Sequence, residues 1–168
     1  MDKSRARNVL LIDDEPGVLS ALARLFKKWN IPVLPTDDPE VALEAVRAGK
    51  ISVVICDQRM PKMEGAKLLA KIKDIDPDTV RIMLTGYADI GAAIEAVNSG
   101  NIFRFLAKPW VEEELRVSVG NAIDRYRLAA ENRALTVEVA KKNAELLDLN
   151  ASLEEKVVVR TEKISQLN

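Results

Sequence analysis

Five short apolar segments alternate with segments of helical spacing up to about Pro109, and this alternation restricts the possible folds most strongly. The clearest are Val9–Ile12 and Ile51–Cys56, which are nearly unbroken runs of branched side chains. Such runs are typical of parallel strands that helices cover on both faces. We therefore predict an α/β protein with a doubly wound parallel sheet and right-handed crossovers. The predicted strands are 8–12, 32–34, 51–56, 80–84 and 102–106, and the predicted helices are 16–29, 39–48, 64–74, 88–99 and 111 onward.

Three acids follow two of these strands. Asp13 and Asp14 come directly after the first strand, and Asp57 ends the third. The carboxyl ends of parallel strands meet at one edge of the sheet, so we expect the three carboxylates to converge and to repel one another unless a cation lies among them. Hard oxygen ligands favour Mg²⁺. Taken alone, Asp14 could instead cap the first helix, and Asp57 could begin a turn.

The fourth and fifth strands end in a hydroxyl and an amine. Thr85 follows the fourth strand and Lys108 the fifth. Either could be an ordinary turn or surface residue, but acid, hydroxyl and amine at successive strand ends together predict a metal and phosphoryl site. Asp57 is the expected nucleophile, with Mg²⁺ neutralising phosphoryl oxygens, Lys108 as a cationic partner and Thr85 as a hydrogen-bond donor.

These residues resemble the response-regulator receiver domain of two-component signalling. The resemblance covers about residues 8–125 and implies a flavodoxin-like (βα)5 fold with strand order 2-1-3-4-5. The segments that carry it are Leu11-Ile12-Asp13-Asp14-Glu15, Asp57 with Met60-Pro61, Thr85, and Lys108-Pro109.

The resemblance also implies a chemistry. Asp57 would accept a phosphoryl group from a sensor histidine kinase. Asp14, Asp57 and the backbone carbonyl of Arg59 would bind Mg²⁺, with Asp13 assisting through water. The Lys108–Pro109 peptide bond is expected to be cis.

Four residues are expected to control the conformational switch and the lifetime of the phosphorylated state. Phe105 could be plain core, but the resemblance implies that Thr85 moves toward the phosphoryl group and that this aromatic ring fills the vacated space. Arg59 and Tyr87 lie two residues after Asp57 and Thr85, where the family modulates its rates. Both are large enough to shield an acyl phosphate from water, so we predict a phosphorylated state that lasts hours.

The pattern changes after Val111, where apolar residues recur at spacings of three, four and seven that are typical of a coiled coil. The steps from Leu149 to Leu153 to Val157 form a stutter, and the polar Asn132 lies in the seam, where such a residue fixes register. The seam residues are Leu128, Leu135, Val139, Leu146, Leu149, Leu153, Val157, Ile164 and Leu167.

As one helix, 111–168 would be roughly 87 Å long. The alternative to a coiled coil is an isolated helix whose apolar stripe is exposed to solvent. We predict a receiver domain at 1–125 and a coiled-coil signalling helix at 126–168, continuous with the fifth helix, that forms a homodimer.

The segment Leu153–Lys163 resembles helices that precede signalling outputs, and this receiver subgroup is often fused to HD-GYP phosphodiesterases. Because the pattern stops at Asn168, we expect an output domain beyond it.

Composition excludes several function classes. The net charge is −1, and the chain from Val111 on carries nine Lys/Arg and eleven Asp/Glu in mixed order, which argues against nucleic-acid binding. The absence of histidine excludes His-based catalysis and His-ligated zinc, and the single Cys56 excludes a disulfide framework. With no apolar run long enough for a membrane span, we expect a soluble, cytoplasmic protein without a membrane partner.

Two other function classes remain open. One is a constitutive dimerisation scaffold whose acid site is idle. The other is an enzyme that hydrolyses external phosphoesters, related to aspartate-nucleophile hydrolases, which need a second acid two residues after the nucleophile. Arg59 occupies that position, so we predict a phosphoacceptor switch and not an enzyme.

Overall fold

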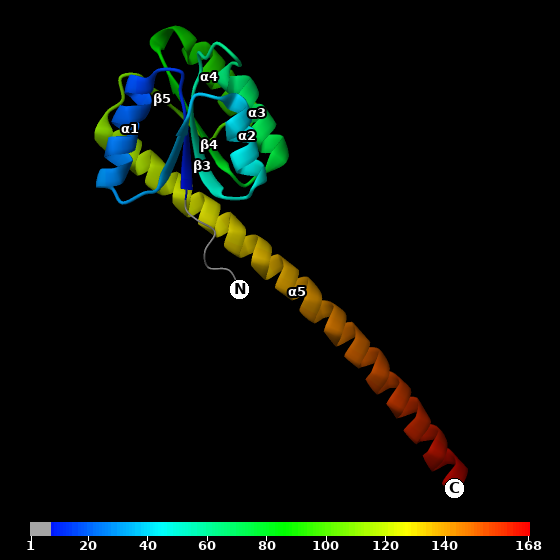
Figure 1. Ribbon diagram of the computed structural model, residues 1–168. Helices are drawn as coiled ribbons and strands as arrows, with labels where there is room; N and C mark the ends of the chain where they lie inside the picture. Colours follow the sequence, from blue (N-terminus) through cyan, green and yellow to red (C-terminus); the bar gives the residue numbers. More distant parts are fainter. Residues whose placement is uncertain (1–7) are drawn as a thin grey trace. The chain divides into compact units, whose positions relative to one another are not determined.

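Five parallel strands in the order β2-β1-β3-β4-β5 form the centre of the computed structural model, which describes residues 8–168 (Figure 1). This is the predicted doubly wound, flavodoxin-like arrangement. The strands are β1 (Asn8–Ile12), β2 (Val33–Thr36), β3 (Ile51–Asp57), β4 (Val80–Thr85) and β5 (Arg104–Ala107). The helices are α1 (Pro16–Lys28), α2 (Pro39–Arg47), α3 (Gly65–Ile75), the 3₁₀ turn η1 (Tyr87–Asp89), α4 (Ile90–Asn98) and α5 (Glu112–Leu167). Residues 1–7 of the predicted receiver domain lie outside the described residues.

The fifth strand begins later than the sequence predicts, at Arg104 and not at residue 102. Gly100 adopts a left-handed conformation (φ 71°), and the N–H groups of Asn101 and Ile102 donate to the carbonyl of Ala96. These bonds close the C-terminal end of α4, which takes both residues away from the sheet ladder.

Both faces of the sheet are buried, because successive strand residues point to opposite sides. Leu10 and Ile12 pack with α2, α3 and α4, whereas Val9 and Leu11 pack with α1 and with the first turns of α5 (Figure 1). Phe26 is completely buried on the second face. The helices cover the faces and leave the carboxyl-terminal edge of the sheet accessible, which is where a site is expected.

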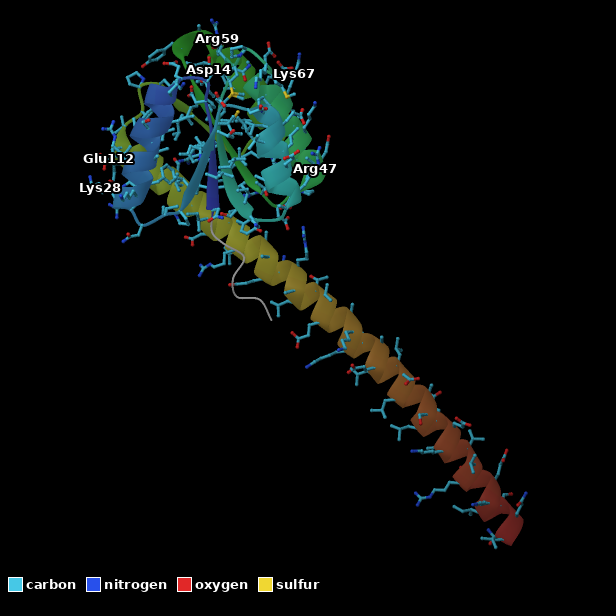
Figure 2. The ribbon with its side chains drawn as sticks, in the orientation of Figure 1. Asp14, Lys28, Arg47, Arg59, Lys67 and Glu112 are labelled. Atoms are coloured by element: carbon cyan, nitrogen blue, oxygen red, sulfur yellow. The ribbon has the colours of Figure 1, made fainter. Side chains whose placement is uncertain are left out.

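The first turns of α5 belong to the domain core. Leu115 and Val119 are fully buried, and Lys28 Nζ of α1 lies 2.8 Å from Glu112 Oε1 of α5 (Figure 2). The Arg104 side chain donates to the buried hydroxyl of Ser118 at 2.9 Å. These contacts fix the start of α5 against α1 and β5.

The chain divides into two compact units, Met1–Leu128 and Ala129–Asn168. The α5 helix continues from Glu112 to Leu167 without interruption. Every residue from Glu131 to Asn168 is exposed, including the apolar ones. Within residues 8–168, no helix is both long enough and apolar enough to cross a membrane.

Candidate functional site

Three charged side chains meet at the carboxyl-terminal edge of the sheet. Lys108 Nζ lies 2.7 Å from Asp13 Oδ2 and 3.0 Å from Asp57 Oδ1, so the amine after β5 bridges the acids that follow β1 and end β3. Asp13 is 1% exposed and Asp57 6%. Buried carboxylates at such distances require a cation, and Lys108 supplies one charge.

Backbone bonds hold these side chains in place. Asp13 Oδ1 accepts the N–H of Glu15 at 2.9 Å, which fixes the turn into α1. The N–H of Lys108 donates to the carbonyl of Thr85 at 2.8 Å, and the Lys108–Pro109 bond is cis, as the resemblance implies.

Asp14 completes an acidic cluster. One carboxylate oxygen from each of Asp13, Asp14 and Asp57 lies within 4.8 Å of the others, and Asp14 is exposed to solvent. The N-cap residue of α1 is Glu15, so Asp14 does not cap that helix. Three hard oxygen donors that converge in this way fit a small divalent cation.

The electrostatics of the cluster agree with this fit. Burial raises the pKa of Asp57 above its usual value, and Asp13 adds to the effect, while Lys108 offsets part of it. Burial alone would lower the pKa of Lys108, but its bonds to Asp13 and Asp57 outweigh burial and raise it. Three carboxylates against one ammonium leave the cluster with excess negative charge, which a divalent cation would balance.

Of the two predicted switch residues, Thr85 ends β4, and Phe105 lies within the neighbouring strand β5, opposite Met83. Thr85 is fully buried, and its hydroxyl donates to the adjacent carbonyl of Gly86 at 3.2 Å. Phe105 is partly buried and packs against the core cluster of α2, α3 and α4. The hydroxyl is thus engaged locally in this structure.

The two predicted rate-modulating residues are exposed. Tyr87 is 77% exposed on η1. Arg59 is 72% exposed, and its Nε lies 2.6 Å from Asp89 Oδ2 at the start of α4. Asp89 was not singled out from the sequence, although an acid at the start of the predicted helix 88–99 was a usable signal.

Two further residues missed by sequence reasoning, Gln58 and Gly65, shape the loop after Asp57. Gln58 accepts the Gly65 N–H through its backbone carbonyl and the Ala66 N–H through its side chain, each at 2.9 Å. A Cβ atom at Gly65 would collide with the backbone carbonyl of Asp57. A glycine at a predicted helix start shortly after Asp57 was the available signal.

A pocket of about 530 Å³ opens beside the cluster. Asp14 and Arg59 lie at the same end of the domain (Figure 2). The residues that line the pocket are Asp14, Gln58, Arg59, Met60, Pro61, Glu64 and Asp89.

Comparison with known proteins gives one consistent result. The family model of the response regulator receiver domain matches residues 9–120. The C4-dicarboxylate transport transcriptional regulatory protein of Rhizobium meliloti is 36% identical over 132 residues, which is 79% of this chain and 28% of that protein. The chain spans only 27% to 29% of the length of the first four curated relatives that it matches.

Solved structures agree. A structure described as adenylate cyclase from Rhodopirellula baltica is 34% identical with a TM-score of 0.73, and the match covers 77% of this chain and 96% of that one. The signal receiver domain of an HD domain-containing protein from Pseudomonas fluorescens Pf-5 is 30% identical with a TM-score of 0.71, over 78% and 96% of the two chains.

Proposed function

The chain belongs to the response regulator receiver family, and from this premise we propose that it is a phosphoacceptor switch in which Asp57 takes a phosphoryl group from a sensor histidine kinase. The observation that carries the proposal is Lys108 Nζ, which bridges Asp13 and Asp57 at 2.7 and 3.0 Å. In the transfer, an Asp57 oxygen forms a bond to phosphorus while the phosphorus–nitrogen bond to the kinase histidine breaks, and the bonding electron pair stays on that nitrogen.

The residues of the site divide the work of this transfer. Asp57 is the nucleophile, and Lys108 is close enough to leave one carboxylate and pair with the incoming phosphoryl oxygens. Such a reaction depends mainly on positioning and charge. The chain takes part in its own phosphorylation, and we do not propose that it turns over an external substrate as an enzyme.

Mg²⁺ is the proposed cofactor. The three carboxylate oxygens within 4.8 Å support it, because hard oxygens with excess negative charge suit this ion. Asp14, Asp57 and the Arg59 carbonyl would hold it directly, with Asp13 acting through water. When bound, it neutralises charge on the phosphoryl oxygens.

Thr85 and Phe105 are the proposed switch. The Thr85 hydroxyl, which now donates to Gly86, would turn to donate to the phosphoryl group, and the Phe105 ring would move into the space that it leaves. The local bond at 3.2 Å is long for a hydroxyl donor, so little is lost when it breaks. Arg59 and Tyr87 would slow hydrolysis, and the expected lifetime of the phosphorylated state is hours.

Incubation with radiolabelled acetyl phosphate and Mg²⁺ tests the acceptor. We expect label on Asp57 that Asp57→Asn abolishes, that Lys108→Met reduces at least tenfold, and that EDTA prevents. Lys62→Met, which removes an exposed lysine 3.0 Å from Asp38, is the matched control and should be labelled normally. Absence of label on the wild-type chain would favour an idle acid site in a constitutive scaffold.

The second part of the proposal is a homodimer through α5 from Leu128 onward. The seam residues Leu135, Leu146 and Val157 are 59%, 62% and 63% exposed in a single chain, so the stripe needs a partner. An identical helix fits it, because Asn132 can pair with its own copy in the seam. Lys142 interrupts the seam but lies 3.7 Å from Glu138 of its own helix.

The flanking charges favour a parallel pair. Glu131, Glu138 and Glu145 recur every seven residues on one side of the seam, with Asn143 and Asn150 on the other side. Parallel helices bring Glu138 and Glu145 opposite the side-chain amides of Asn143 and Asn150 in the other helix, whereas antiparallel helices would place glutamates opposite glutamates.

Disulfide trapping tests both the dimer and its direction. In a Cys56→Ala background, Leu135→Cys and Ile164→Cys should each form a symmetric disulfide under mild oxidation. These positions lie roughly 44 Å apart along a helix, so both can meet their own copies only in a parallel, in-register pair. Leu147→Cys, 72% exposed and off the seam, is the control and should trap far less. Trapping at neither seam position would refute the dimer.

We further propose that the receiver controls an output of the second-messenger class. The support is that two similar structures carry the descriptions adenylate cyclase and HD domain-containing protein. Phosphorylation would alter helix pairing along the continuous α5, with the stutter at Leu149–Val157 as a bistable element. The proposed location is the cytoplasm. We do not propose that this chain contacts nucleic acid, because acidic and basic residues are interspersed along α5.

A further inference from the structure

An ion pair beside the acid cluster joins the loop after β3 to the start of α4. Arg59 follows β3, and Asp89 ends η1 at the start of α4, with Nε and Oδ2 2.6 Å apart. Both residues line the pocket that opens next to Asp14. The pair therefore borders the pocket beside the acid cluster.

Asp89 departs from ordinary capping behaviour. It is the N-cap residue of α4, yet its side chain makes no cap hydrogen bond there. Asp38, the N-cap of α2, accepts the N–H of Glu40 at 2.9 Å with one oxygen and pairs with Lys62 through the other. In the described chain, the carboxylate of Asp89 is thus held by Arg59 and not by the helix it begins.

Arg59 is also within the electrostatic reach of the nucleophile. The bond to Asp89 raises the pKa of the guanidinium, and the charge of Asp57 contributes in the same direction. The Arg59 guanidinium is therefore attracted by two anions, and the balance between these attractions depends on the charge at each of them.

We propose that Arg59 exchanges partners when Asp57 is phosphorylated, leaving Asp89 to bind the phosphoryl group and thereby releasing the start of α4. Asp89 is then a positioning residue that competes for Arg59 in the unphosphorylated state. The inference rests on the proposed function, because it needs a phosphoryl group on Asp57.

The exchange is energetically reasonable. An ion pair whose arginine is 72% exposed contributes little to stability, because solvent screens its charges. A phosphoryl group brings more charge than a carboxylate and offers oxygens that a guanidinium binds in pairs. After phosphorylation, the phosphoryl group is therefore a better partner for Arg59 than Asp89 is. Breaking the exposed Arg59–Asp89 ion pair costs little free energy.

Calorimetric titration of the full chain with beryllofluoride in Mg²⁺, a phosphoryl mimic, tests the exchange. Asp89→Asn frees Arg59 and should tighten mimic binding about fivefold or more, and Arg59→Gln should weaken it by a similar factor. The double variant should match Arg59→Gln, because Asp89 acts only through Arg59. If Asp89→Asn tightens binding equally without Arg59, simple charge repulsion explains it and the inference is wrong.

A second readout follows the release of α4. Hydrogen exchange of the 87–92 segment should become several-fold faster when wild type binds the mimic. In Asp89→Asn it should be fast from the start and should not respond to the mimic. Lys62→Gln breaks the exposed ion pair with Asp38, and Lys62 lies in the same loop as Arg59, between β3 and α3. This control should change neither the affinity for the mimic nor the hydrogen exchange of segment 87–92.

The outcomes separate this inference from the proposed function. Failure of the wild-type chain to bind the mimic would overturn both. Normal wild-type binding with Asp89→Asn unchanged in affinity and in exchange would overturn only the partner exchange and would leave the phosphoacceptor role intact.

Discussion

The two units of the chain use the same apolar residue types in opposite ways. In the receiver unit, Leu10 and Val53 are completely buried, whereas in the tail Leu146 and Val157 are 62% and 63% exposed. The domain contains the partners of its own apolar side chains, since two core clusters cover both faces of the sheet. The tail has no such partners within its own unit. The stability of the domain should therefore be independent of concentration, and that of the paired tail should not.

The largest expected effect tests the domain side of this contrast. Phe26 is fully buried, with its ring centroid 5.2 Å from that of Trp29. Phe26→Ala should cost about 3 to 5 kcal/mol of unfolding free energy, because it leaves a cavity in a packed core. Urea unfolding at two protein concentrations should give the same loss. A loss that depends on concentration would mean that the domain is stabilised by association.

In the tail, by contrast, a substitution in the seam should weaken dimerisation and leave the stability of the receiver unit unchanged. Leu146→Asp would bury a charge in each helix of the pair and should weaken dimerisation by about 3 kcal/mol or more, over 100-fold in Kd. Sedimentation equilibrium measures this. Leu147→Asp changes a neighbour off the seam, and a comparable loss there would contradict the assigned seam. Neither substitution should change domain unfolding at low concentration.

Gly65 tests how tightly the loop after Asp57 is packed against helix α3. Gly65→Ala places a methyl group against the Asp57 carbonyl, so we expect a destabilisation of about 1 to 3 kcal/mol and weaker Mg²⁺ binding. At Gly17, by contrast, an added Cβ meets nothing within 4 Å, and Gly17→Ala should be neutral or stabilising by about 0.5 kcal/mol. Thermal unfolding and Mg²⁺ titration of the two variants distinguish a specific close approach from a general helix effect.

Strand positions could be predicted because hydrophobic runs report burial on both faces, and the rule that strand ends converge correctly placed Asp57 beside Lys108. The predicted start of β5 at residue 102 was wrong. Ile102 is apolar like a strand residue, but its N–H donates to the carbonyl of Ala96 at the C-terminal end of α4. Local composition cannot distinguish these two uses of one buried isoleucine.

Other parts of the site depend on geometry that spacing does not contain. The partner of Arg59 is thirty residues away in another loop, and a long, exposed side chain can reach several anions. The close approach at Gly65 depends on how α3 returns against β3. In the proposed switch, the orientations of Thr85 and Phe105 would change with phosphorylation, so no single sequence pattern fixes them.

The smallest expected effect concerns the charge of the Asp57 carboxylate. Burial raises the pKa of Asp57, so its ionised form costs stability once the pH rises above the ordinary carboxyl value of 3.8 and through the raised value. In EDTA at pH 7, Asp57→Asn should therefore be more stable than wild type by about 1 kcal/mol after allowance for solvent screening. The difference should shrink as the pH falls toward 4, because the wild-type carboxyl then becomes neutral as well.

Magnesium should reverse this order. At 100 times its Kd the ion would stabilise wild type by about 2.7 kcal/mol, and the variant, which lacks one carboxylate ligand, should gain much less. Chemical unfolding with EDTA or Mg²⁺ at pH 4 to 7 measures both effects. Wild type that is already the more stable form in EDTA at pH 7 would show that Lys108 compensates the buried charge fully. The effect should persist at concentrations where the tail is unpaired, because the acid site lies wholly within the receiver unit.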